Sequence, residues 1–240
     1  MNQVRRVIVN GAHGKMGKIA TQAVEQDPHL ALVCGLGRHD NLVQAIKQHS
    51  PDIIIDFTVP SAVKHNTQLY IDHNVHPIIG TSGLLAQDIN QYREQCKAKN
   101  LGALIVPNFC ISAILMMHFS QHAAKYFEHV EITEFHQKEK KDAPSATARK
   151  TAQVIVSANK TLNIKKDGRG DQSEGLSIHS QRTPQQHARQ IVSFNNEHEQ
   201  LNIESTCYDR HSYQKGIILA CHHVTQLTTL YDGLSQLILK

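Results

Sequence analysis

A histidine and several basic residues share a short segment in the middle of the 240-residue chain. His136 and Lys140 are four positions apart, between an alternating apolar and polar segment at residues 130–135 and a helical pattern at residues 148–156. A histidine can supply a proton near neutral pH, and a lysine supplies a fixed positive charge. The spacing predicts a strand-to-helix loop that protonates a small acidic substrate, with a solvated basic loop as the alternative.

Two hydroxyl side chains precede the helix that follows this loop. Ser145 or Thr147 can cap the helix, because a side-chain oxygen at the N-cap accepts a backbone N–H of the first turn. The other N–H groups of that turn are suited to a carboxylate. We therefore expect an acid-binding site next to His136, although an ordinary helix cap has the same sequence.

A second candidate site lies near the N-terminus, where Gly11, Gly14 and Gly17 follow an apolar strand pattern at residues 6–10 and open a helix at residues 18–26. Strand, glycine turn and helix form the context of a dinucleotide-binding fingerprint, in which the glycines allow a tight turn, close approach of a pyrophosphate and close helix packing. The alternative is a turn with a structural role only. No G-x-x-x-x-G-K-[ST] segment occurs, which excludes a P-loop.

The end of the next strand pattern, residues 30–36, bears on the choice of cofactor. Arg38, and His39 beside it, could face a 2′-phosphate, which favours NADPH. Asp40 could instead bind the ribose of NADH, or cap a helix at residues 41–48.

Strand and helix patterns alternate five times in the first half of the chain. The strands are expected at residues 6–10, 30–36, 51–58, 76–80 and 102–106. Such alternation is typical of an α/β fold with a doubly wound, Rossmann-type parallel sheet, whose ligands lie at the carboxyl ends of the strands. Those ends hold the glycine turn, Arg38, residues 56–58, residues 80–82 and residues 108–109.

The pattern changes after a helix at residues 111–127. Strand patterns at 130–135, 177–183, 190–195 and 200–207, interrupted by a polar, glycine-rich loop at 165–171 expected to be mobile, predict a smaller α+β domain with an open mixed sheet. Residues 216–226 and 231–239 are expected to be helices that return to the first domain. We therefore assign residues 1–109 and 211–240 to a dinucleotide-binding domain and residues 110–210 to a substrate-binding and oligomerisation domain.

Composition narrows the class of protein. The net charge is +4 and the basic residues are scattered, which argues against a nucleic-acid partner. No apolar run is long enough to cross a membrane, and no signal peptide is evident. The five cysteines are widely spaced, which favours thiols in a reducing compartment, and we expect a cytoplasmic protein without a metal site. The pair His222-His223 is expected on a helix surface.

The chain resembles the 4-hydroxy-tetrahydrodipicolinate reductase (dihydrodipicolinate reductase) family over nearly its whole length. The resemblance rests on six motifs in order: Gly11-Ala12-His13-Gly14-Lys15-Met16-Gly17, Asp56-Phe57-Thr58-Val59-Pro60, Gly80-Thr81-Ser82-Gly83, Pro107-Asn108-Phe109, Glu134-x-His136-x-x-x-Lys140-x-Asp142-Ala143-Pro144-Ser145-x-Thr147-Ala148, and Arg210 to Gly216. The fifth motif is highly specific.

The resemblance implies a role for each matching residue. His136 would be the general acid, and Lys140 a second proton donor or a carboxylate anchor. The substrate carboxylate would meet Gln137, Ser145, Ala146 and Thr147. The cofactor would be held by Gly11, Ala12, His13, Gly14, Lys15, Met16 and Arg38, with Gly80, Thr81, Ser82, Val106, Pro107, Asn108 and Phe109 around the nicotinamide.

The implied reaction is the NAD(P)H-dependent reduction of 4-hydroxy-tetrahydrodipicolinate to tetrahydrodipicolinate in the diaminopimelate and lysine pathway. The family implies a homotetramer that pairs through its second domains, which close over the substrate. Some residues depart from the family pattern: Gln137 replaces a histidine, Ala146 a glycine, and Pro184 and Ala188 glycines in the segment 182–190. Two alternatives therefore stay open, a non-catalytic relative that binds a dinucleotide or dicarboxylate and another NAD(P)-dependent oxidoreductase.

Overall fold

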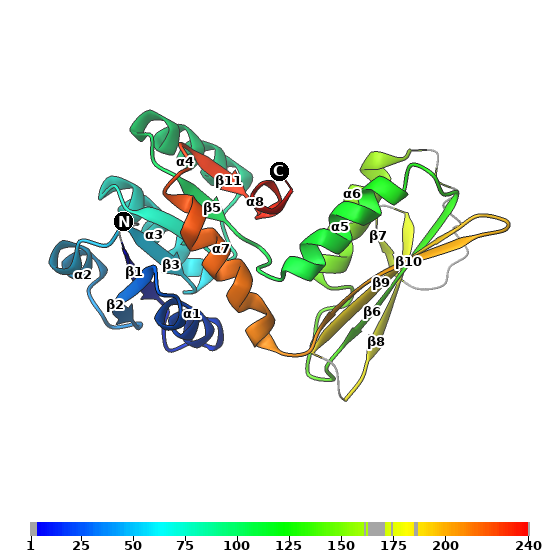
Figure 1. Cartoon of the computed structure of the whole chain (residues 1–240), viewed down its shortest axis with the longest axis horizontal. Coiled ribbons are helices and arrows are strands. Elements are labelled where there is room, and N and C mark those ends of the chain that lie inside the picture. The colour runs from blue at the N-terminus through cyan, green and yellow to red at the C-terminus, as the bar shows by residue number, and fades with distance from the viewer. Residues whose placement is uncertain (1–3, 161, 163–170, 174, 185–186, 240) are drawn as a thin grey trace. The chain divides into compact units, whose positions relative to one another are not determined.

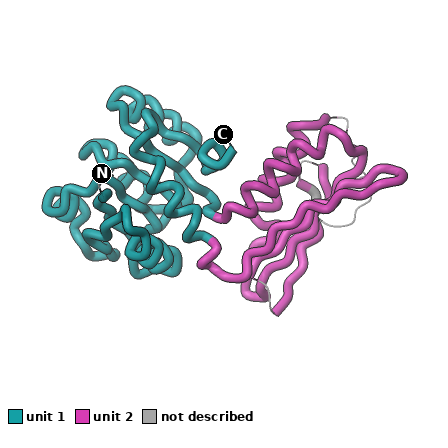
Figure 2. Tube along the Cα trace, in the orientation of Figure 1, with its two compact units in different colours: residues 1–109, 213–240 teal, residues 110–212 magenta. Residues whose placement is uncertain are grey.

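The computed structural model describes residues 4–160, 162, 171–173, 175–184 and 187–239 (Figure 1). The chain divides into two compact units. Unit 1 comprises Met1–Phe109 and Tyr213–Lys240, and unit 2 comprises Cys110–Ser212 (Figure 2). Each unit has its own sheet and helices, and each is described by itself.

Unit 1 is built on a six-stranded sheet in which every recorded pairing is parallel, in the order β11-β5-β4-β3-β1-β2. The strands are β1 (Arg5–Asn10), β2 (Leu30–Leu36), β3 (Ile53–Asp56), β4 (His76–Ile79), β5 (Ala103–Ile105) and β11 (Leu230–Asp232). Their central members are apolar on both sides because helices cover both faces, as expected of a parallel sheet. The predicted doubly wound sheet is confirmed.

The helices of unit 1 lie around this sheet (Figure 1). They are α1 (Lys15–Gln26), α2 (Leu42–His49), α3 (Pro60–Asp72), α4 (Ala86–Lys99), α7 (Gln214–Val224) and the short α8 (Ser235–Ile238). One core cluster joins Ile8 and Ile54 to Ile46 of α2, and another joins Ile79 to Tyr92 and Cys96 of α4. This packing fixes the turns at the strand ends.

The prediction for the last thirty residues was partly wrong. Residues 230–232 form strand β11 beside β5, and helix α8 is restricted to Ser235–Ile238, where a helix over 231–239 was expected. Gly233 adopts a φ of +82°, which ends the strand and turns the chain into the short helix. The predicted helix at 216–226 corresponds to α7.

Unit 2 has a five-stranded mixed sheet in the order β10-β9-β6-β8-β7, with α5 (Ile111–Ala123) and α6 (Ala146–Ala158) on one face (Figure 1). The strands are β6 (His129–His136), β7 (Asp171–Ser173), β8 (Leu176–Arg182), β9 (Ala188–Asn195) and β10 (Gln200–Cys207). Only the β6–β8 pair is parallel among the recorded pairings. Val130, Ile132 and Phe194 pack on apolar residues of both helices, so the helices and central strands share one core.

The predicted open mixed sheet is confirmed, with two adjustments. Strand β7 was not expected, because Asp171 had been placed at the end of the polar loop. The rest of that predicted loop, residues 165–170, lies outside the described residues. Helix α5 ends at Ala123 rather than at residue 127. Within the part of the chain that is described, no helix combines the length and apolar character needed to span a membrane.

Candidate active site

The glycine turn of unit 1 connects β1 to α1 and depends on the absence of side chains. Gly11 has a φ of +87°, and a Cβ there would overlap the backbone of Phe57. A Cβ on Gly17 would overlap the carbonyl oxygen of Gly11, so helix and turn pack backbone to backbone. The N–H groups of Gly11 and Ala12 both donate to the Leu36 carbonyl at 2.9 Å, which ties the turn to β2.

Helix α1 begins directly after this turn with a glycine at its N-cap. Gly14 has no side chain to cap the first turn, whose N–H groups lack acceptors within the helix. No acidic residue lies in this first turn, and Lys15 is its first residue. A helix N-terminus of this kind attracts phosphate through its N–H groups and its dipole. The predicted residues 11–16 therefore form a turn with the geometry that a pyrophosphate requires.

A buried carboxylate organises the neighbouring strand ends. Asp56, which is fully buried at the end of β3, accepts hydrogen bonds from Thr58 Oγ1 at 2.7 Å, Thr81 Oγ1 at 2.6 Å and Tyr70 OH at 2.6 Å. Burial, together with the charge of Asp56, raises the pKa of Tyr70 well above its ordinary value. Asp56 had been placed among the ligand-facing strand ends, but its bonds show that it holds the loops after β3 and β4 in position.

Two aromatic rings pack against each other at the same edge of the sheet, with their planes tilted by 58°. The ring centroids of Phe57 and Phe109 lie 5.4 Å apart, and a Cβ on Gly80 would overlap the Phe57 ring. Val106 N–H donates to the Ile79 carbonyl at 2.8 Å, which joins the ends of β4 and β5. The residues predicted to surround the nicotinamide (Gly80, Thr81, Ser82, Val106, Pro107, Asn108, Phe109) are thus brought together; Thr81 is buried and Ser82 is exposed.

The turn after β2 holds the residues that bear on cofactor preference. Arg38 is exposed, whereas Asp40 Oδ2 accepts the Gly37 N–H at 2.7 Å. The His13 ring lies against Gly37, where a Cβ would be too close. Helix α2 is capped by Asn41, which accepts the Gln44 N–H at 3.0 Å, so the suggestion that Asp40 caps this helix was wrong.

In unit 2, His136 ends strand β6 with both ring nitrogens near acceptors. Nε2 lies 3.3 Å from Glu134 Oε2, and Nδ1 lies 3.4 Å from the His187 carbonyl oxygen. Burial raises the pKa of Glu134, but hydrogen bonds from His136, Ser145 and Ser180 outweigh it and lower the pKa to about 2. Glu134 is therefore ionised at neutral pH, and the His136 ring lies between two hydrogen-bond acceptors.

The loop after β6 is held by an arginine from β8. Arg182 Nε donates to the Lys140 carbonyl at 3.2 Å, and its Nη2 donates to the Asp142 carbonyl at 2.6 Å. Lys140 Nζ lies 2.8 Å from Asp142 Oδ1, and its side chain is 29% exposed. The hydrogen bond from Lys140 lowers the pKa of Asp142. Arg182 thus fixes the backbone that carries Lys140, while the ammonium group stays accessible.

Helix α6 begins where this loop ends. Ser145 Oγ accepts the Ala148 N–H at 3.1 Å, and the Ser145 N–H donates to Glu134 at 3.0 Å. Of the predicted substrate-binding residues, Gln137 and Ala146 are exposed, Thr147 is half-buried, and Ser145 is buried as the N-cap. The sequence left Ser145 and Thr147 as possible caps of this helix, and in the structure Ser145 is the N-cap.

Three supporting residues were not assigned a role from the sequence. Glu134 lay within the most specific motif, but its contact with His136 depends on the alternation of β6. Ser180 donates to Glu134 at 2.8 Å and Arg182 holds the loop; both depend on the register of β6 and β8, which pairs Glu134 with Ser180 and His136 with Arg182. From the sequence, Arg182 was named only as the first residue of the segment 182–190, which departs from the family pattern, and it was given no role.

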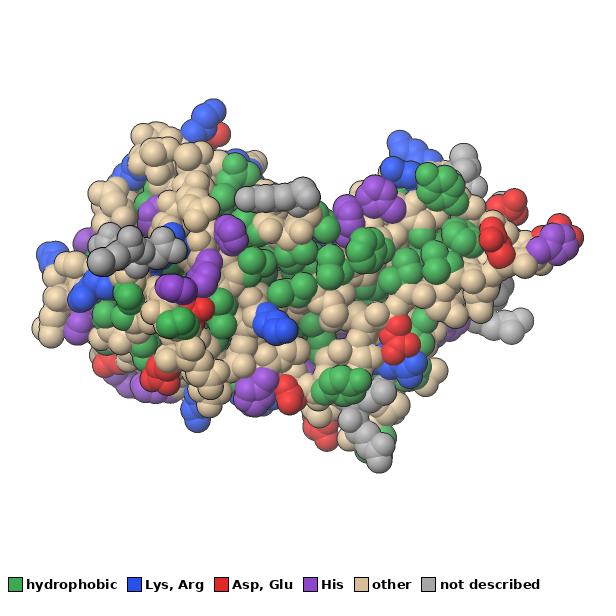
Figure 3. All heavy atoms as spheres, viewed as in Figure 1, with side chains coloured by type: hydrophobic (Ala, Val, Ile, Leu, Met, Phe, Trp, Pro, Cys, Tyr) green, Lys and Arg blue, Asp and Glu red, His purple; other side chains and the backbone are tan. Residues whose placement is uncertain are grey.

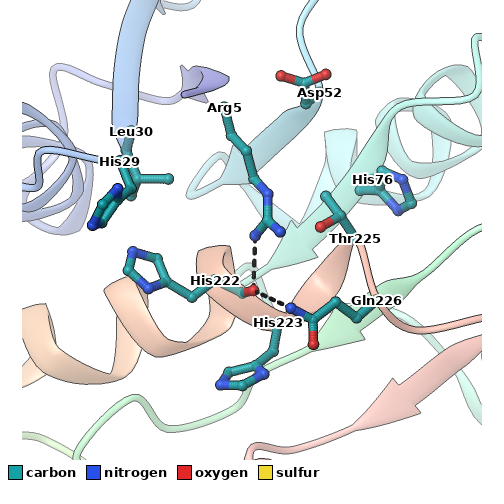
Figure 4. Close-up of a pocket in the computed structure, with 9 residues that line it drawn as sticks. All are labelled: Arg5, His29, Leu30, Asp52, His76, His222, His223, Thr225 and Gln226. Carbon is teal, nitrogen blue, oxygen red and sulfur yellow. Dashed lines mark hydrogen bonds between the residues drawn. The ribbon is translucent and has the colours of Figure 1, made fainter. Parts of the chain in front are cut away.

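A separate cavity of about 540 Å³ lies at the amino ends of the strands in unit 1, the edge opposite the glycine turn (Figure 4). Arg5, His76, His222 and His223 are among the residues that line it, and Arg5 donates to the His222 carbonyl at 2.7 Å. None of the predicted site residues lines this cavity. Among the described residues, no group of three potential metal ligands gathers at any place.

The surface does not present a single charged field. On the face shown in Figure 3, lysine and arginine side chains are interspersed with acidic ones, and histidines occur at several separate places.

Family models match both parts of the chain. The model for the N-terminus of dihydrodipicolinate reductase matches residues 5–109, and the model for its C-terminus matches residues 112–237. The chain belongs to the dihydrodipicolinate reductase family. Two relatives named 4-hydroxy-tetrahydrodipicolinate reductase, from Coxiella burnetii and Legionella pneumophila (strain Corby), are 41% and 42% identical; each alignment covers 97% of this chain, and 98% and 99% of the relative.

Solved structures agree with this family assignment. Dihydrodipicolinate reductase from Paenisporosarcina sp. TG-14, solved with dipicolinate bound, superposes with a TM-score of 0.91 at 33% identity, over 98% of this chain and 99% of that one. A probable dehydrogenase from Thermotoga maritima has a TM-score of 0.65 at 10% identity, over 95% of this chain and 91% of that one. The second likeness is one of fold alone.

Proposed function

We propose that this chain catalyses the NAD(P)H-dependent reduction of 4-hydroxy-tetrahydrodipicolinate to tetrahydrodipicolinate in the diaminopimelate and lysine pathway. The activity is the one named for its relatives in Coxiella and Legionella. Within the chain itself, the proposal rests above all on His136, whose ring lies between the ionised Glu134 and a backbone carbonyl. Membership of the reductase family and the surroundings of His136 both support a reduction in which a histidine supplies the proton.

His136 is proposed as the general acid. A carboxylate and a carbonyl can only accept hydrogen bonds, so an N–H on either ring nitrogen has an acceptor within reach. His136 is 13% exposed, which leaves part of the ring accessible to an acid bound at the surface of unit 2. NAD(P)H, when bound, supplies the hydride that adds to the conjugated imine formed by loss of water from the substrate. His136 supplies the accompanying proton and then regains one from solvent.

The substrate carboxylate is proposed to bind at the N-terminus of α6. The first-turn backbone N–H groups at Ala146 and Thr147 suit an anion, and the helix dipole adds to the attraction. Lys140 and Gln137 are proposed as further contacts, with Lys140 offsetting the negative charge of a dicarboxylate. Asp142 pairs with the ammonium group of Lys140, so that an incoming carboxylate would compete with Asp142.

Residues 11–16 are proposed to hold the pyrophosphate of the cofactor. The glycine turn and the uncapped start of α1 fit this group, since a side chain at Gly11 would fill the turn. NADPH is proposed as the preferred form. The exposed Arg38 carries the charge that a 2′-phosphate requires, and Asp40 is engaged by the Gly37 N–H.

A homotetramer in the cytoplasm is proposed as the working form. Helices α5 and α6 cover one face of the unit 2 sheet, and the other face carries partly exposed residues such as Phe135 and Ile191. Pairing of these faces between copies would bury them. The five cysteines, all among the described residues, form no disulfide, which fits a reducing compartment.

The test measures loss of nicotinamide absorbance with NADPH or NADH and substrate made in situ from pyruvate and aspartate semialdehyde. We expect His136→Ala to lower turnover by roughly 100- to 10,000-fold and to leave NADPH binding unchanged. The control is His129→Ala, at the other end of β6, which should retain turnover.

Turnover by His136→Ala at the wild-type rate would remove the assignment of the general acid. A wild-type protein that binds NADPH tightly but does not turn over would instead be a non-catalytic relative. Turnover on a different acid only, with indifference to Lys140→Ala, would indicate another oxidoreductase.

A further inference from the structure

Two cysteines far apart in the sequence are in direct contact within unit 2. Cys110 is the N-cap of α5 and Cys207 is the last residue of β10, and their sulfur atoms lie 2.7 Å apart. Both side chains are buried, with 3% and 6% exposure. Neither has a role in the proposed reduction, and the remaining three cysteines of the chain do not contribute to this contact.

The surroundings of the pair distinguish its two sulfur atoms. Cys110 Sγ lies 3.2 Å from Ser112 Oγ, which in turn lies 2.8 Å from Ser205 Oγ. The hydrogen bond with Cys207, reinforced by Ser112 and by N–H groups at the start of α5, lowers the pKa of Cys110 below that of an ordinary thiol. The same contact raises the pKa of Cys207. The two shifts have opposite directions, so Cys110 is the thiol of the pair that ionises first.

We propose that Cys110 and Cys207 form an oxidation site at which a hydroperoxide converts the two thiols into an intramolecular disulfide. The Cys110 thiolate attacks one peroxide oxygen, which breaks the O–O bond, and hydroxide leaves. Cys207 then attacks the sulfur of the resulting sulfenic acid, forming the S–S bond as its own proton and the sulfenic hydroxyl leave as water. The peroxide is reduced by two electrons and the pair of thiols is oxidised by two.

The contact makes the second step fast compared with further oxidation. The sulfur atoms need to close only from 2.7 Å to about 2.0 Å, so they need little further approach once the peroxide has reached the buried Cys110. A sulfenic acid next to a resolving thiol forms a reversible disulfide instead of advancing to the irreversible sulfinic acid. A thiol reductant would then restore both cysteines.

The disulfide would close a loop that contains nearly all of unit 2. The two residues are 97 positions apart, and every strand of the second sheet lies between them or ends at Cys207. A cross-link across so long a loop restricts the unfolded chain and raises the melting temperature of the oxidised protein.

The experiment treats the full-length, fully reduced protein with hydrogen peroxide and maps the products by intact mass and by peptide mass under non-reducing conditions. Wild type is expected to lose two hydrogens and two titratable thiols, to yield a Cys110–Cys207 linked peptide and to melt at a higher temperature. Cys34→Ser, which removes the partly exposed thiol outside the pair, should behave in the same way. Dithiothreitol should reverse both changes.

Cys110→Ser and Cys207→Ser should form no intramolecular disulfide, and their melting temperatures should not rise with peroxide. Serine is close in size to cysteine, and the melting temperature of each reduced variant checks that it is folded. Cys207→Ser should in addition accumulate oxygen adducts on Cys110, since its resolving thiol is gone. The proposal is overturned if wild type acquires no 110–207 linkage, if its linkage joins different cysteines, or if Cys207→Ser loses two thiols as wild type does.

Discussion

The two candidate sites, one in each unit, are built from different parts of the polypeptide. At the glycine turn of unit 1, the binding surface is backbone, and its shape depends on the absence of side chains at Gly11 and Gly17. At the loop after β6 in unit 2, the chemistry depends on charged side chains, with His136 held by Glu134 and the Lys140 backbone held by Arg182. Added volume should therefore damage the first region, whereas loss of one charge should damage the second.

Among the variants that compare the two regions, the largest effect is expected for Glu134→Gln, which keeps the size of the side chain and removes its charge. Turnover should fall by roughly 100-fold because the protonated His136 loses its counter-charge. Binding of NADPH to unit 1 should not change. Steady-state turnover and NADPH titration measure the two effects, and Glu131→Gln, an exposed position on the same strand, is the control. Equal losses in both variants would contradict the assigned partner of His136.

The same carboxylate predicts a dependence of stability on pH. The pKa of Glu134 is lowered from 4.5 to about 2, so its contribution to stability is complete above pH 4.5 and is lost as the pH falls toward 2. The shift corresponds to about 3 kcal/mol. Urea unfolding between pH 5 and pH 2 should show a steeper loss of stability for wild type than for Glu134→Gln. Parallel curves would mean that other carboxyl groups govern acid unfolding.

Gly11→Ala tests the region built from backbone. The new Cβ would overlap the backbone of Phe57 at a φ of +87°, and we expect binding of NADPH to weaken by roughly 30-fold, about 2 kcal/mol. Gly233→Ala is the matched control, because Gly233 also has a positive φ, +82°, but has open space around it. Fluorescence titration with NADPH measures both. Similar losses in the two variants would assign the effect to backbone strain alone.

Arg182→Ala tests whether the hydrogen bonds that hold the loop backbone contribute as much to turnover as the charged side chains of the loop. Turnover should fall by about 10-fold through misplacement of Lys140, with a rise in KM for the acid, since the arginine donates to the Lys140 and Asp142 carbonyls. Arg189→Ala, which removes an ion pair with Glu204 elsewhere on the sheet, is the control. An unchanged KM in Arg182→Ala would argue that the loop holds its shape without the guanidinium group.

The smallest effect is expected at the turn after β2. Arg38→Asp should weaken the binding of NADPH by several-fold, within about 1 kcal/mol for an exposed charge. It should weaken the binding of NADH less. Dissociation constants for both cofactors measure the difference. Equal weakening of NADPH and NADH would remove Arg38 from a role at the 2′-phosphate.

Local patterns were sufficient to predict most of the fold. Apolar strands that alternate with helices indicated the parallel sheet, and the later strand patterns indicated a mixed one; both are confirmed. Strand β11 was missed because Tyr231, Leu234 and Leu237 are spaced as on a helix face, while the strand is stabilised by pairing with β5, a contact far away in sequence. In the sequence, only Gly233 indicated that the helical pattern is interrupted there. In the structure this residue has a positive φ.

The candidate site was predictable where its residues follow one another in the chain. The glycine turn and the segment from His136 to Thr147 are local, and the structure places each at the end of a strand and the start of a helix. Ser180 and Arg182 were not assigned, because their contacts with Glu134 and the loop arise from the parallel register of β6 and β8. A single sequence contains no local signal for that register.

Among the described residues, the hydrogen bonds from Arg182 to the loop after β6 go to carbonyl oxygens, those of Lys140 and Asp142. Every residue type offers the same carbonyl, so the arginine is indifferent to the side chains that the loop carries. The residue types at exposed positions such as Lys138 and Glu139 can therefore differ between related proteins. They are also suitable attachment points for a spectroscopic label that would report the arrival of an acid without disturbing the residues that bind it.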